Sequence, residues 1–172
     1  MMTGVVMMLA VIVGGVVQVQ LPAPALLGQA RFPILLAVAL YYALNYHVGI
    51  AILAGILTGF TQDVLSPMPL GYSMLCFCAA AYVAGRFRAL VMPDSLATAA
   101  FFGASASAGV AVGLTTLLLS SRSVAYAAGW IGLKVVGFAL LGAVATPVVF
   151  AMLGKLDRVV GNLRVERTVD GF

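Results

Sequence analysis

Long stretches without a formal charge dominate this 172-residue chain. The first runs from Met2 to Leu21 and the second from Phe32 to Thr61, and neither contains Asp, Glu, Lys or Arg. About 20 apolar residues in a helix are enough to cross the hydrocarbon core of a bilayer. Charged residues make up only 8% of the chain and its mean hydropathy is +1.15, whereas a soluble domain is about 25% charged. The sequence therefore predicts a polytopic, all-α transmembrane helix bundle.

The second stretch has two interpretations. As one helix it is too long for a straight crossing, since about 30 residues reach roughly 45 Å. Asn45, Tyr46, His47 and Gly49 lie at its middle, so it forms either two short helices joined by a polar hairpin or one long tilted helix. The first alternative gives six spans and the second gives five. The other expected helices cover residues 2–21, 71–85, 95–119 and 127–153.

Basic residues predict the orientation of the chain. Positive residues accumulate in the cytoplasmic loops of membrane proteins. Arg86 and Arg88 follow the 71–85 helix, and Lys155 and Arg158 follow the last one, so we expect these four to be cytoplasmic anchors. The predicted organisation is a helix bundle over residues 1–154 and a basic cytoplasmic tail over residues 155–172. No basic run resembles a nucleic-acid groove, so we expect the lipid bilayer, and no nucleic acid, as a partner.

The sequence contains few residues for catalysis. Its one histidine, His47, lies at the expected hairpin without a nucleophile motif, and Cys76 and Cys78 lie in an apolar segment. A zinc site needs several His or Cys ligands at suitable spacing, and nucleotide sites need a glycine-rich phosphate loop. Neither pattern is present, so we predict no enzymatic activity, no metal and no cofactor.

A stripe of small residues ends in an acid. Ala51, Gly55, Gly59 and Asp63 follow one another at intervals of four, which places them on one face of a helix. Small faces of this kind allow close approach between membrane helices. We therefore expect this face, with Gly71 in the following turn, to pack against a helix of the same bundle or to bind a partner.

Two ionisable residues are expected near the outer membrane surface. Lys134 lies inside the last span and Asp63 borders an earlier one. Ionisable groups in membranes find a partner or extend to the headgroups. We hypothesise a buried ion pair between Asp63 and Lys134, with extension of the lysine to the headgroups as the alternative.

The segment from Gly55 to Tyr72 resembles the rod shape-determining protein MreD family. The family pattern is Gly, three residues, Gly, three residues, Asp, then a turn with Ser and Pro, and Gly before the next span; this chain has Gly55, Gly59, Asp63 and Gly71. Size, span count, the 31–33 Arg-Phe-Pro entry and the basic tail are also similar. Many members have an acid after that proline, where this chain has Ile34.

The resemblance implies a non-catalytic scaffold in the bacterial inner (cytoplasmic) membrane. Its partners would be MreC, MreB, RodA and a class B penicillin-binding protein of the cell-elongation complex, which supports peptidoglycan synthesis and rod shape. The resemblance also implies a bundle similar to the substrate-binding subunits of energy-coupling-factor vitamin transporters. A small-ligand-binding transport subunit of that type is the alternative function, with Asn45, Tyr46, Gln62 and Asp63 as polar groups split between the two membrane faces.

Overall fold

A computed structural model describes residues 2–21, 32–66, 70–87, 96–120 and 128–160, and within them it contains six α-helices and no strand. The bounds are α1 (Met2–Gln20), α2 (Ile34–Asn45), α3 (Val48–Leu65), α4 (Tyr72–Arg86), α5 (Leu96–Ser120) and α6 (Ala128–Val160). The predicted all-helical membrane bundle is confirmed. The long uncharged stretch forms α2 and α3, so the hairpin alternative is correct and the single tilted helix is wrong.

Four of the described helices are long and apolar enough to cross a bilayer: α1, α3, α5 and α6. The other two, α2 and α4, have 12 and 15 residues. Exposed apolar side chains cover the outer faces of the long helices, for example Ile12 on α1, Phe101 on α5 and Val144 on α6. In water such a surface would aggregate, but in a membrane it contacts lipid. The molecule is therefore a helical membrane protein.

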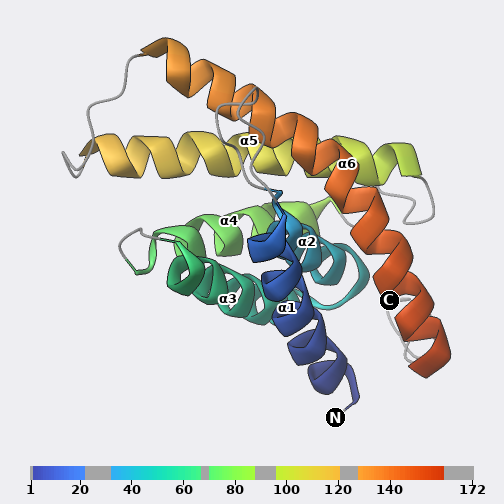
Figure 1. The fold of residues 1–172 in the computed structure, drawn as a ribbon. Coiled ribbons are helices and arrows are strands. Elements are labelled where there is room, and N and C mark those ends of the chain that lie inside the picture. Colours follow the sequence, from blue (N-terminus) through green and yellow to red (C-terminus); the bar gives the residue numbers. More distant parts are fainter. Residues whose placement is uncertain (1, 22–31, 67–69, 88–95, 121–127, 161–172) are drawn as a thin grey trace.

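The short helix α2 forms the centre of the bundle. Each of its residues from Leu35 to Leu44 is buried, and it contacts all five other helices. A helix that is apolar on every side is stable only inside such a core. Figure 1 shows α1, α3 and α4 grouped around it, with α5 and α6 crossing each other on one side of that group.

The last helix is longer than predicted. We expected it to end at Leu153, but α6 continues to Val160 and includes Lys155, Asp157 and Arg158, which the sequence analysis placed in the cytoplasmic tail. In this extension Leu153 and Asp157 are buried while Lys155 and Arg158 are exposed. One face of this charged segment thus belongs to the bundle.

Candidate functional site

Asp63 caps the N-terminus of α4. Its Oδ2 accepts hydrogen bonds from the backbone N–H groups of Gly71 (2.7 Å) and Met74 (3.4 Å), and its Oδ1 accepts one from Ser73 (3.0 Å). The first amides of a helix have no partner within the helix and carry partial positive charge. A carboxylate is the ligand that such a helix end favours, and Asp63 supplies it although it is only 2% exposed.

The turn before α4 depends on glycine. Gly71 has φ 103°, in the left-handed region, and is the N-cap residue of α4. A residue with a side chain rarely adopts this conformation. Gly71 therefore allows the chain to turn within eight residues of Asp63 and to present its own N–H to the carboxylate.

The rest of the small stripe packs against α4. A Cβ atom on Gly55 would lie 3.0 Å from the Cα of Cys78, and one on Gly59 would overlap the backbone of Met74. Ala51, on the same stripe, is fully buried. The stripe predicted from the sequence therefore lies inside the bundle, with α4 in the position where a partner helix would otherwise bind.

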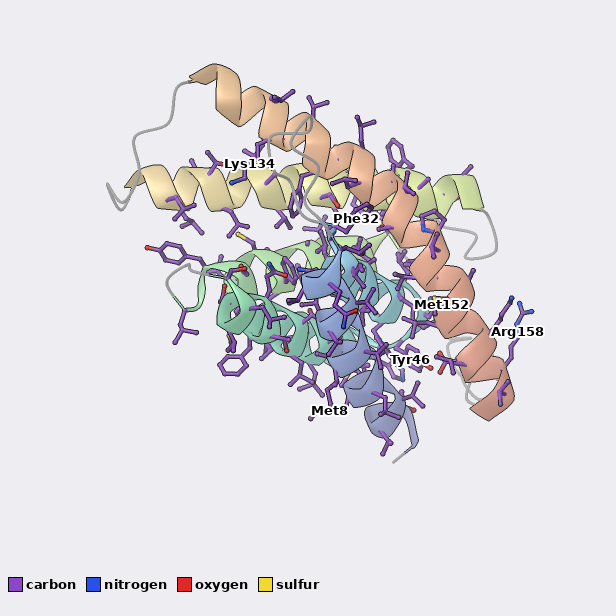
Figure 2. The ribbon with its side chains drawn as sticks, in the orientation of Figure 1. Met8, Phe32, Tyr46, Lys134, Met152 and Arg158 are labelled. Atoms are coloured by element: carbon purple, nitrogen blue, oxygen red, sulfur yellow. The ribbon has the colours of Figure 1, made fainter. Side chains whose placement is uncertain are left out.

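Lys134 is exposed near the start of α6, and Figure 2 places it beside α5. Every hydrogen bond described for Asp63 comes from a backbone amide of the turn or of α4. These amides satisfy the carboxylate locally. The ion pair between Asp63 and Lys134 stays a prediction, and none of the described contacts of Asp63 supports it.

A glutamine pair joins α1, α2 and α3. The side-chain amide of Gln18 donates to Oε1 of Gln62 at 2.5 Å, and Oε1 of Gln18 accepts the backbone N–H of Leu35 at 3.1 Å. Gln62 also donates to Ser66 at 3.0 Å. Gln18 therefore satisfies one of the free amides at the start of α2, which has no side-chain cap of its own.

A second buried carboxylate lies at the other end of α3, near the C-terminal end of α6. Oδ2 of Asp157 accepts hydrogen bonds from the hydroxyl groups of Tyr41 (2.7 Å) and Tyr46 (2.8 Å). The residue is 1% exposed. Figure 2 shows Tyr46 close to this end of α6, with Arg158 directed away from the bundle.

The aromatic rings around Asp157 contact one another. Tyr42 lies 5.5 Å from Tyr41 and 5.2 Å from Tyr46 between ring centroids, and Tyr41 lies edge-on to Phe150 of α6 at 5.4 Å. Within the described part of the chain, two buried oxygens of this cluster accept and donate no hydrogen bond: Oδ1 of Asp157 and the hydroxyl of Tyr42. Buried polar atoms are rarely left in this state.

The close crossing of α5 and α6 is built from small residues. A Cβ atom on Gly103 would overlap Thr146, and one on Gly142 would overlap Ser107. Gly103 and Ser107 therefore face α6. Ser105 and Gly109, on another side of α5, are exposed, and a Cβ atom on Gly109 would meet nothing within 4 Å.

Three of the four predicted cytoplasmic anchors are exposed near the C-terminal ends of helices. Arg86 is exposed in the last turn of α4 and stacks over Tyr82 at 5.9 Å, and Lys155 and Arg158 are exposed in the last turns of α6. Arg88 lies outside the described residues. Basic residues in the last turn also complement the helix dipole.

Sequence reasoning missed Gln18, Tyr41 and Asp157. One signal was available for the last of these: Leu141, Ala145, Val149, Leu153 and Asp157 follow one another at intervals of four, which continues the inner face of α6. The described residues contain no group of three His, Cys, Asp or Glu side chains able to hold a metal ion.

Comparisons with known protein families, with curated proteins and with solved structures found no match for this chain.

Proposed function

We propose that this protein is a non-catalytic scaffold subunit of the bacterial cell-elongation complex, in the inner membrane, with a role like that of the MreD family. One observation supports this most. The resemblance rests on four residues that form one structural unit: Gly55, Gly59, Asp63 and Gly71. The first two allow α3 to pack closely against α4, and the other two form the N-terminal cap of α4. A motif with this role stabilises the fold, and the intervals between its residues are those that the packing of α3 on α4 requires.

This arrangement also indicates where a partner would bind. Since α4 covers the small stripe, we propose that the transmembrane helix of MreC contacts an outer, lipid-facing side of the bundle. Helices associate in membranes through packing rather than through a hydrophobic driving force. The exposed faces of α1, α5 and α6 are the candidates, and α5 offers Ser105 and Gly109 without large side chains.

The test is co-purification with MreC from native membranes, combined with a photo-crosslinking residue at single positions. Ile12, Phe101 and Val144 sample the three outer faces, and buried Ala54 is the matched interior control. We expect capture of MreC, crosslinks from one outer face and none from Ala54. Absence of MreC from the purified material, together with retention of rod shape after depletion of the protein, would contradict the scaffold function.

The alternative, a vitamin-type transport subunit, needs polar groups that converge on one cavity. Gln62 and Asp63 lie near the end of α3, whereas Asn45 and Tyr46 precede its start. Fourteen residues of α3, 48–61, lie between the two pairs, which corresponds to about 21 Å along a helix. Native mass spectrometry that shows a bound small organic ligand after purification would favour the transport subunit over the scaffold.

A further inference from the structure

The environment of Asp157 concentrates negative charge in a buried place. Asp157 lies in the last turn of α6, which ends at Val160. Tyr46, which donates to it, directly follows the last residue of α2. The C-terminal end of a helix carries roughly half an elementary negative charge. The α3 helix begins at Val48, so its positive N-terminus offsets the C-terminus of α2. The Asp157 carboxylate and the C-terminal end of α6 remain together, and each would favour a cation.

The basic side chains nearest in sequence do not provide that cation. Lys155 and Arg158 are on the same helix as Asp157 but are exposed, and the described hydrogen bonds of Asp157 come from two neutral tyrosine hydroxyls. Both hydroxyls donate to Oδ2. Oδ1 is buried and accepts no hydrogen bond from the described residues.

A third oxygen in the cluster is also unpaired. The hydroxyl of Tyr42 has no hydrogen-bond partner among the described residues, and Tyr42 is fully buried between Tyr41 and Tyr46. Burying a polar atom without a partner destabilises the folded state. A ligand that binds both unpaired oxygens would remove this destabilisation for each of them.

We propose that Asp157 Oδ1 and the Tyr42 hydroxyl oxygen bind one monovalent alkali cation, at the junction of α2 and α6. Hard cations prefer oxygen ligands, and helix C-termini hold Na⁺ in other membrane proteins. A single carboxylate balances one positive charge, whereas calcium sites generally contain several carboxylates. The space around a residue that is 1% exposed favours a small cation over a larger organic one. This inference is independent of the scaffold function.

Thermal unfolding of the purified full-length protein in detergent tests the proposal. NaCl or KCl is titrated against choline chloride at constant ionic strength, and bound Na⁺ is counted by equilibrium dialysis. A ligand that binds only the folded state raises the Tm with the logarithm of its concentration above Kd. We expect a saturable rise with Na⁺ or K⁺ and about one ion per chain. The same Tm in choline as in both alkali salts would overturn the proposal.

Asp157→Asn is the decisive variant, because its amide oxygen still accepts from Tyr41 and Tyr46 while its charge is lost. We expect this variant to fold and to lose the cation response. Asp63→Asn, which also neutralises a buried carboxylate, is the matched control and is expected to keep the response. A cation response that persists in Asp157→Asn would overturn the assignment.

Tyr42→Phe provides a second test if Asp157→Asn does not fold. It removes only a hydroxyl that has no partner among the described residues, so the stability without alkali cation is expected to stay the same or to rise. We expect an apparent Kd for Na⁺ weakened by about tenfold, the equivalent of one lost ligand worth 1.4 kcal/mol. An unchanged Kd would exclude the Tyr42 oxygen and overturn the site as proposed.

Discussion

The two buried aspartates of this protein are satisfied in different ways. Asp63 receives its hydrogen bonds from backbone amides 8 to 11 residues later in the chain, at a helix N-terminus. Asp157 receives them from two side chains that are 116 and 111 residues away, near helix C-termini. The first carboxylate lies at the positive end of α4, whereas the second lies in the last turn of α6, at its negative end. The comparison shows that Asp63 stabilises a local turn and helix end. Asp157 instead connects helices that are distant in the sequence, and one of its oxygens has no hydrogen bond from the described residues.

The largest expected effect tests the local unit. In Gly59→Leu the new side chain would collide with the backbone of Met74, whose amide is hydrogen-bonded to Asp63. Overpacking of a core costs about 1–3 kcal/mol and occasionally more, and here it also separates Asp63 from α4. We expect loss of monodisperse protein in size-exclusion chromatography.

Gly49→Leu is the matched control for that variant. Gly49 lies on the same helix, and a Cβ atom there would meet nothing within 4 Å. We expect it to purify like the wild type. Equal yields of folded protein from the two variants would show that α3 and α4 are not packed as described.

The second prediction removes the cap itself. Asp63→Ala leaves the amides of Gly71 and Ser73 without their acceptor inside the bundle, and a hydrogen bond to a charged group contributes about 1.5–3 kcal/mol. We expect a marked fall in Tm, with Asp63→Asn between the alanine variant and the wild type because it keeps one acceptor oxygen. If the asparagine and alanine variants unfold at the same temperature, the backbone hydrogen bonds are not the stabilising interaction.

The third prediction concerns the long-range contact. Tyr41→Phe and Tyr46→Phe each remove one donor to Oδ2 of Asp157, and we expect each to cost about 1–2 kcal/mol. Because the two hydroxyls share one acceptor, the double variant should not show the sum of the two single effects. A double-mutant cycle by thermal unfolding measures this coupling, and strict additivity would contradict a shared acceptor.

The same difference explains how much the sequence could predict. The spacing of Gly55, Gly59 and Asp63 is visible within one helix, and their partners follow directly in the chain, so the sequence predicts the residues of this unit. For Asp157, by contrast, both partners lie in a stretch that the sequence shows only as uncharged. Lys155 and Arg158 also made the end of α6 look like a soluble tail, although Leu153 and Asp157 continue its buried face. A contact between residues more than a hundred positions apart depends on how the helices pack, and the spacing of residues within one helix does not predict that packing.

The smallest expected effect distinguishes the contribution of the Ser73 backbone from that of its side chain at the N-terminus of α4. Ser73 is buried, and its N–H binds Asp63 while its hydroxyl has no hydrogen-bond partner among the described residues. Ser73→Ala keeps the amide and removes only the unpaired oxygen, so we expect the stability to change by less than about 0.5 kcal/mol, or to rise slightly. Chemical or thermal unfolding in detergent, with Asp63→Ala beside it, measures the difference. A loss as large as that of Asp63→Ala would mean that the serine side chain, and not the helix N-terminus, holds the carboxylate, and the contrast with the tyrosine-bound Asp157 would no longer stand.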